Sequence, residues 1–131
     1  MNLTVHIIDD DDALRDSTRA LLESYGHDVR DYHSAEAFLA CSCENAGCLL
    51  VDYHMPGKTG LDLLEHLFAR GHRMPALLMT GRNDPTIAAR ASRLGVKYLN
   101  KPVVADQLIT WIEQAQWPAI DLAQAEPQRL S

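Results

Sequence analysis

Residues 6–17 read HIIDDDDALRDS, and this stretch decides the fold. An apolar run from Leu3 to Ile8 ends in four consecutive aspartates, Asp9 to Asp12, and a helical pattern begins directly after them. Neighbouring carboxylates repel one another, so a folded domain that keeps four of them at the end of a strand needs something to stabilise them. The rest of the sequence indicates what that is.

Short apolar runs alternate with helical patterns along the chain. Strands are predicted at residues 3–8, 28–32, 48–52, 76–80 and 96–100, each followed by a helical pattern. Ser34 and Asp84 are favourable N-caps, and Pro85 suits the first position of a helix. Strands that are apolar throughout are covered on both faces, which is typical of a parallel sheet. The sequence therefore predicts an α/β fold, a five-stranded parallel sheet with helices on both faces.

The helical patterns also predict which faces pack on the sheet. In the first helix, one face carries Leu14, Thr18, Leu21 and Tyr25, and Gly26 follows as a stop. In the last helix, the corresponding side chains are Leu108, Trp111, Ile112 and Ala115.

Composition excludes several classes of protein. A chain of 131 residues predicts one domain, here residues 1–116, followed by a linker or tail at residues 117–131 that contains two prolines. The net charge of -6 argues against nucleic-acid binding by this segment, because phosphate contacts need basic residues. No apolar run approaches the roughly 20 residues of a membrane helix, and no secretory signal is visible, so the cytoplasm is the expected compartment.

Three cysteines cluster in the sequence at Cys41, Cys43 and Cys48, with His33 upstream. A zinc site would need a second pair of ligands, which the spacing does not show, and an odd number of cysteines cannot pair completely within one chain. We interpret them as small apolar side chains rather than as a metal site or a redox pair.

Polar residues stand at the ends of the predicted strands, where open α/β sheets bind their ligands. These residues are Asp9, Asp10, Asp52, Thr80 and Lys101. Asp11 and Asp12 are explained separately, because acidic residues stabilise the start of a helix. Asp9, Asp10 and Asp52 remain as three carboxylates beside one lysine. A hard cation such as Mg²⁺ prefers oxygen ligands and would relieve their repulsion.

Four segments carry a resemblance to a known family. They are VHIIDD (5–10), LLVDYHMPGKTG (49–60), ALLMTG (76–81) and YLNKP (98–102). With them, the chain from about Leu3 to Gln116 resembles the receiver domain of two-component response regulators, which has a flavodoxin-like (βα)5 fold. SAEAFL (34–39) and MTGRND (79–84) are most similar to receivers that regulate nitrogen fixation and related transcription.

The resemblance implies a phosphoacceptor domain for signalling rather than a turnover enzyme. Asp52 would accept a phosphoryl group from a phosphohistidine on a sensor histidine kinase, and Lys101 would pair with the phosphoryl oxygens. The implied Mg²⁺ ligands are Asp9 through water, Asp10, Asp52 and the backbone carbonyl of His54. The peptide bond between Lys101 and Pro102 is typically cis in this family.

The resemblance also implies a switch made by Thr80 and Tyr98. When the Thr80 hydroxyl turns toward the phosphoryl group, Tyr98 would fill the vacated space and change the surface of the fourth helix, the fifth strand and the last helix. Ile109 and Trp111 lie on opposite flanks of the last helix, so at least one of them should be partly exposed. We therefore expect phosphorylation to promote a symmetric homodimer through this surface. Val103 departs from the phenylalanine that many receivers carry after Lys-Pro, which alters packing near this surface.

Two other functions remain open from the residues alone. Asp9 and Asp11 form an Asp-x-Asp pattern, as in Mg²⁺-dependent phosphatases of the haloacid dehalogenase class. That class also needs a late acidic metal motif, and after Asp84 only isolated acids occur. The other alternative is a receiver-like interaction module that is never phosphorylated, against which the joint presence of Asp52, Thr80 and Lys101 argues.

Overall fold

The polypeptide forms one parallel β-sheet with helices on both faces, as the sequence predicts. The structure, a computed structural model, describes residues 4–41, 47–72 and 74–115. The strands lie in the order β2-β1-β3-β4-β5, with bounds β1 (Thr4–Ile8), β2 (Asp28–Tyr32), β3 (Gly47–Asp52), β4 (Ala76–Thr80) and β5 (Lys97–Asn100). The helices are α1 (Asp12–Ser24), α2 (Ala35–Ala40), α3 (Gly60–Ala69) and α4 (Pro85–Leu94), and a further helix spans residues 105–115.

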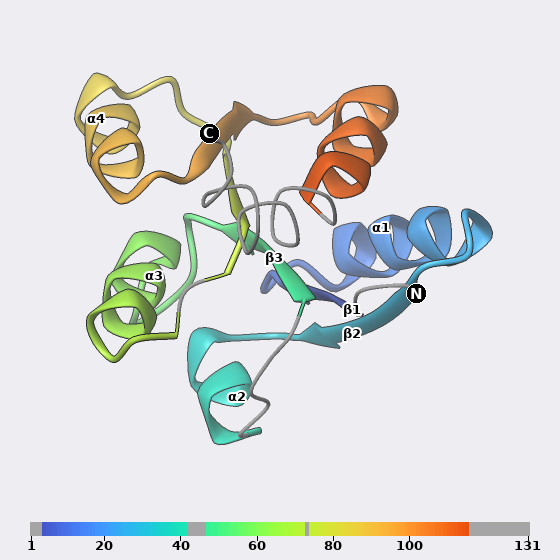
Figure 1. The fold of residues 1–131 in the computed structure, drawn as a ribbon, viewed down its shortest axis with the longest axis horizontal. Helices are drawn as coiled ribbons and strands as arrows, with labels where there is room; N and C mark the ends of the chain where they lie inside the picture. Colours follow the sequence, from blue (N-terminus) through green and yellow to red (C-terminus); the bar gives the residue numbers. More distant parts are fainter. Residues whose placement is uncertain (1–3, 42–46, 73, 116–131) are drawn as a thin grey trace, which may run out of the picture.

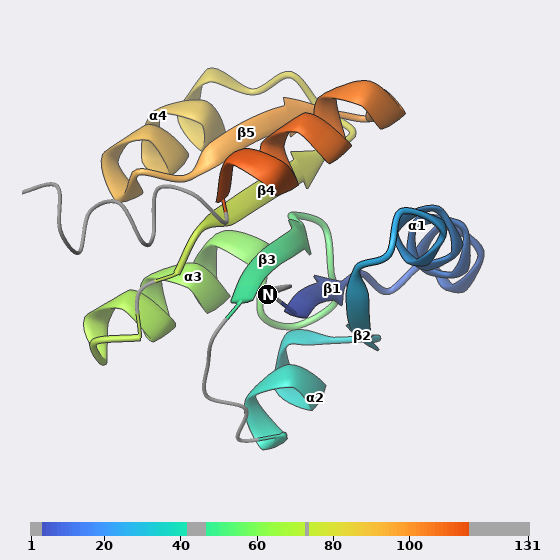
Figure 2. The same cartoon turned by 45° about the vertical axis from the view of Figure 1, so that its right-hand side comes forward.

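Two apolar layers hold the helices against the sheet. Figure 1 shows the helices on either side of the strands. Successive side chains of a strand point to opposite faces, so each buried strand contributes to both layers. In β3, Leu49 and Val51 pack with residues of α2, α3 and α4. Cys48 and Leu50 of the same strand pack with residues of α1 and the 105–115 helix. Figure 2 shows β5 between α4 and the 105–115 helix.

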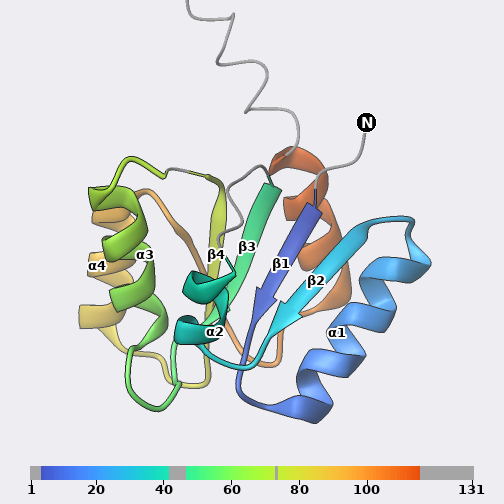
Figure 3. The same cartoon turned by 90° about the horizontal axis from the view of Figure 1, so that it is seen from below.

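Figure 3 shows the strands of the sheet side by side. Their order and register bring the predicted polar residues to one edge of the sheet. Ile8 pairs with Val51, so Asp9 and Asp52 follow at neighbouring strand ends. Asp52 pairs with Met79, so Thr80 comes directly after it on β4. Thr80 pairs with Asn100, and Lys101 therefore leaves β5 at the same edge.

Local hydrogen bonds explain where the helices begin. Asp11 is the N-cap of α1, its side chain accepts from the Leu14 amide, and Asp12 lies in the first turn, as predicted. Ser34 caps α2 and Asp84 caps α4, again as predicted, with Pro85 at the start of α4. Such caps satisfy amides that have no partner within the helix.

The predicted packing face of α1 is partly wrong. Leu21 packs against the core, but the only fully buried side chain of α1 is Leu22, and Leu14 and Tyr25 are exposed. The helix is turned so that Arg15 reaches the neighbouring strand β2, where it forms an ion pair. A pattern that counts only apolar residues misses this orientation.

Other expectations from the sequence have mixed outcomes. The Lys101–Pro102 peptide bond is cis, as expected. Cys41 is exposed and Cys48 is buried, each as a free thiol, whereas Cys43 and the predicted tail at residues 117–131 lie outside the described residues. Within the described ranges, none of the helices combines the length and the apolar character needed to span a bilayer.

Candidate functional site

Three carboxylates converge at the ends of β1 and β3. Asp9, Asp10 and Asp52 each place an oxygen within 4.8 Å of the others. Asp9 and Asp52 are buried, with 1% and 4% of their surface exposed, whereas Asp10 faces solvent. We call these three residues the acid cluster. An oxygen-only donor set that is open to water on one side fits Mg²⁺, which keeps several water ligands.

Lys101 completes this site from the end of β5. Its Nζ lies 3.0 Å from Asp52 Oδ1 and 3.7 Å from Asp9 Oδ2. The single ammonium group of Lys101 does not balance the negative charge of the three carboxylates of the acid cluster. A divalent cation would supply the missing positive charge, which is a second reason that the site fits Mg²⁺.

Burial and charge shift the titration of the central pair. Burial raises the pKa of Asp52, and the charges of Asp9 and Asp10 add to this, while the hydrogen bond and charge of Lys101 oppose it. Burial by itself lowers the pKa of Lys101, but its bond to Asp52 and the nearby acidic charges outweigh it, so the pKa is raised. Lys101 therefore stays protonated beside the Asp52 carboxylate.

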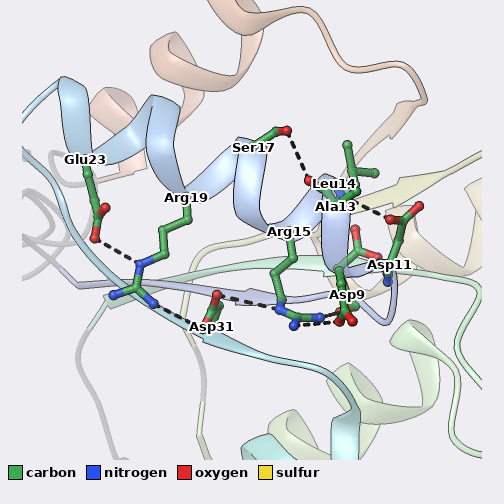
Figure 4. A network of polar contacts seen from close by, with 10 residues as sticks. Asp9, Asp11, Ala13, Leu14, Arg15, Ser17, Arg19, Glu23 and Asp31 are labelled. Carbon is green, nitrogen blue, oxygen red and sulfur yellow. Dashed lines mark hydrogen bonds and ion pairs between the residues drawn. The ribbon is translucent and has the colours of Figure 1, made fainter.

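Asp9 is held on both its backbone and its side chain. Its amide donates to the Tyr32 carbonyl at 3.1 Å, and its Oδ1 accepts from the Asp11 amide at 3.0 Å. Its carbonyl accepts from Arg15 Nη1 at 2.8 Å (Figure 4). The sequence reasoning missed Arg15, since only its spacing from Asp12 signalled an ion pair within the helix.

The loop after β3 is packed directly against Asp52. The Tyr53 amide donates to the Met79 carbonyl, and the Gly60 amide donates to the Tyr53 carbonyl. A Cβ atom on Gly60 would lie 2.5 Å from the Asp52 carbonyl oxygen, so only glycine permits this approach at the start of α3. His54 lies in this loop with its side chain exposed, and the ligand role of its carbonyl stays a prediction.

Thr80 and Tyr98 bind the same backbone segment. The fully buried Thr80 accepts from the Arg82 amide through Oγ1 at 3.1 Å. The Tyr98 hydroxyl donates to the Arg82 carbonyl at 3.0 Å and accepts from the Asp84 amide at 3.4 Å. The two predicted switch residues are thus linked through the loop between β4 and α4.

A groove opens beside the acid cluster, between α1 and the 105–115 helix. Its volume is about 440 Å³, and its lining is largely apolar. Leu14 and Leu21 of α1 line one side and Val103 and Leu108 the other, and Asp9 and Lys101 lie at its polar end. The exposed Leu14 therefore belongs to a surface that adjoins the site.

Two alternatives from the sequence, a phosphatase of the Asp-x-Asp type and a redox-active cysteine, fit this geometry poorly. The Asp11 carboxylate is used as the cap of α1, at 3.1 Å from the Leu14 amide, and it is not a member of the acid cluster, so the Asp-x-Asp pattern lacks its second acid. Burial raises the pKa of the Cys48 thiol to about 12, which makes it unreactive.

Comparisons with known proteins bear on the family and the fold of this chain. The family model of the response regulator receiver domain matches residues 5–113. The transcriptional regulatory protein FixJ of Azorhizobium caulinodans is 47% identical over 103 residues, which are 77% of this chain and 49% of that protein. FixJ of Bradyrhizobium diazoefficiens is 41% identical over 125 residues, covering 94% of this chain and 58% of that protein. The crystal structure of FixJ-N gives a TM-score of 0.79 at 35% identity, over 88% of this chain and 94% of that one.

The chain spans about half the length of these FixJ proteins. Their similarity confirms the predicted likeness to receivers of the nitrogen-fixation-regulator type. The match to the family model covers most of the sequence, from β1 into the 105–115 helix. This chain belongs to the response regulator receiver domain family.

Proposed function

We propose that this receiver domain accepts a phosphoryl group on Asp52 from a phosphohistidine of a sensor histidine kinase, in a reaction that depends on Mg²⁺. The observation that carries the proposal is the position of Asp52, between the Lys101 ammonium at 3.0 Å and two further carboxylates. A carboxylate can act as the nucleophile in phosphoryl transfer. The transfer then needs cations on the oxygens of the transferred group.

Each residue of the site has a part in this reaction. Asp52 is the nucleophile, and Lys101 would leave its ion pair with the carboxylate to pair with a phosphoryl oxygen. The residues that would hold Mg²⁺ are Asp9 through water, Asp10, Asp52 and the backbone carbonyl of His54. A bound ion would supply positive charge for the phosphoryl oxygens. The domain thus promotes its own phosphorylation and dephosphorylation and serves as a signalling component rather than as a turnover enzyme.

Thr80 and Tyr98 transmit the change to the surface. A phosphoryl group brings a charge of about -1.5 to -2 and three acceptor oxygens. The Thr80 hydroxyl would exchange its contacts with Arg82 for one of these oxygens. The loop that also holds Tyr98 would then rearrange, which changes the surface formed by α4, β5 and the 105–115 helix. Homodimerisation through this surface is the output we expect.

The groove beside the acid cluster suits a protein donor. A kinase must bring its phosphohistidine to Asp52, and the apolar lining around Leu14 and Val103 lies next to that point. We assign this groove to kinase docking. Because the FixJ relatives are transcriptional regulators of about twice this length, the output is most simply the control of transcription by a further domain, in the cytoplasm.

Intact-mass spectrometry tests the proposal directly. Acetyl phosphate with Mg²⁺ should add one phosphoryl group to the wild-type protein and none without the metal. Asp52→Asn should remain unlabelled, and Asp9→Asn should still be labelled, though more slowly. Labelling that survives Asp52→Asn but not Asp9→Asn would identify Asp9 as the nucleophile and favour the phosphatase reading.

A further inference from the structure

Arg15 is a second cation beside the acid cluster, where it contacts the backbone carbonyl of Asp9. Its three guanidinium nitrogens each face an oxygen from a different segment (Figure 4). Nη1 donates to the Asp9 carbonyl at 2.8 Å and Nη2 to Asp12 Oδ1 at 2.8 Å, while Nε lies 3.6 Å from Asp31 Oδ2 on β2. The side chain is only 15% exposed, so the guanidinium group is held in place.

The hydrogen bond from Arg15 to the Asp9 carbonyl also affects where the Asp10 side chain points. The Asp9 carbonyl belongs to the peptide unit that joins the two aspartates, and a peptide unit is planar. A hydrogen bond that fixes this carbonyl therefore also fixes where the Cα atom of Asp10 lies. Asp10 is the solvent-exposed member of the acid cluster, so its direction depends most on its backbone.

The charge of Arg15 is matched by carboxylates outside the acid cluster. Burial opposes the charged form, but the hydrogen bond and charge of Asp12, with the charges of Asp31 and Asp16, outweigh it and raise the pKa of Arg15. Arg15 meets the acid cluster through a neutral carbonyl group instead. Its effect on the cluster is therefore one of orientation more than of charge.

We propose that Arg15 is a positioning residue, which holds the peptide unit between Asp9 and Asp10 so that the acid cluster is preformed for a divalent cation. This proposal rests on the proposed Mg²⁺-dependent function. If Arg15 acts through orientation, its removal should change the cation affinity in the opposite direction from that expected if it acts through charge. The loss of a positive charge near the cluster would tighten cation binding, whereas the loss of the hydrogen bond would weaken it.

The chain supplies a matched control in Arg19. It lies one turn further along α1 and binds the same Asp31, at 3.2 Å, but its other bond goes to Glu23 on its own helix. Arg15→Met and Arg19→Met therefore remove the same charge from the same network, and only the first removes the bond to Asp9. Arg15→Lys restores the charge and one donor, and Arg15→Gln is a neutral replacement if the methionine variant does not fold.

The dissociation constant for Mg²⁺, measured by titration calorimetry, is the first readout. Arg15→Met or Arg15→Gln should weaken binding roughly threefold to tenfold, the scale of one lost hydrogen bond. Arg19→Met should stay within about twofold of wild type, as expected for an exposed ion pair. Arg15→Lys should recover part of the loss. Unchanged or tighter binding in the neutral Arg15 variants would overturn the proposal.

Amide exchange in metal-free protein is the second readout, because it does not depend on phosphorylation. The Asp11 amide donates to Asp9 Oδ1, so its exchange should be faster in Arg15→Met than in Arg19→Met. Equal exchange in the two variants would count against the positioning role. A wild-type protein that binds Mg²⁺ but is never labelled on Asp52 would refute the proposed function alone, and these two readouts would still decide the role of Arg15.

Discussion

Lys101 and Asp52 form the ion pair at the centre of the site, with 3.0 Å between Nζ and Oδ1. They come from β5 and β3, which are separated by β4 in the sheet. In the proposed reaction, the ammonium group would have to release the Asp52 carboxylate before it could contact the phosphoryl oxygens. A divalent cation bound at the acid cluster would compete with Lys101 for the same carboxylates.

Lys101→Ala should therefore bind Mg²⁺ at least as tightly as the wild type. Removing a like charge near the cation favours binding by a few-fold, while phosphorylation and the response to it should be lost. Titration calorimetry measures the first effect and mass spectrometry the second. Lys97→Ala, on the exposed part of β5, is the control and should leave the Mg²⁺ affinity and the extent of phosphorylation unchanged. A large loss of Mg²⁺ affinity in Lys101→Ala would show that the lysine has a different role.

Gly60→Ala should destabilise the domain. Alanine is the better helix former, but its Cβ would lie 2.5 Å from the Asp52 carbonyl oxygen and 2.9 Å from Val51 Cγ1. Overpacking of this kind costs about 1–3 kcal/mol of unfolding free energy, and it should displace Asp52 and slow phosphorylation. Urea denaturation gives the free energy. Gly81→Ala is the control, since a Cβ there meets open space, and a similar cost in both variants would rule out the collision as the cause.

His6 should make stability depend on pH. Burial lowers the pKa of His6 from 6.5, and the charge of Arg30 adds to this, while Asp28 opposes it. The unfolded state then binds the proton more tightly, so the free energy of unfolding should fall as the pH drops below 6.5 toward the folded pKa. His6→Gln should remove the contribution of His6 to the slope of the unfolding free energy against pH. Denaturation between about pH 8 and pH 5 tests it, and parallel curves would contradict the assignment to His6.

Leu14→Ser should impair transfer from a sensor kinase but not from acetyl phosphate. Leu14 lines the groove beside Asp9 and Lys101, and it is 37% exposed. Loss of one apolar contact in a docking surface costs about 1–2 kcal/mol, which is roughly a fivefold to thirtyfold loss in transfer efficiency. Tyr25→Ser is the control, because Tyr25 is 54% exposed at the other end of α1. Equally efficient phosphoryl transfer from the kinase to the two variants would contradict the assignment of kinase docking to this groove.

Beryllium fluoride with Mg²⁺, which imitates the phosphoryl group, should promote a symmetric dimer. The expected surface is formed by α4, β5 and the 105–115 helix, where Trp111 is half-buried and lines a second hollow of about 330 Å³ with Leu99. Sedimentation velocity measures the shift, and Tyr98→Ala and Trp111→Ala should reduce it. Tyr25→Ser, which lies elsewhere, should not. A monomer at high protein concentration with the mimic bound would leave partner docking as the use of this surface.

The sequence predicted those parts of the molecule that follow from local rules. Asp11 and Asp12 start α1 because a carboxylate satisfies free amides at a helix start, and this depends only on neighbouring residues. The convergence of Asp9 and Asp52 was predictable as well, because carboxyl ends of parallel strands share one edge of the sheet. Both predictions needed only the order of elements and the residues at their ends.

Contacts between distant segments were beyond that reasoning. The orientation of α1 depends on the ion pair between Arg15 and Asp31, which no apolar pattern reports. The close approach of Gly60 to Asp52 depends on how the loop after β3 packs. The link from Thr80 to Tyr98 through Arg82 likewise required the structure, although the resemblance had named both residues.

The order of the strands has a consequence for the protein during its synthesis. Asp52 is synthesised with β3, but Lys101 follows only after β5, which is the last strand in the sequence and one of the two edge strands of the sheet. A nascent chain that ends before β5 therefore lacks the ammonium group that pairs with Asp52. In the proposed reaction, such a chain would have no lysine to pair with the phosphoryl oxygens, so we expect it to be phosphorylated poorly.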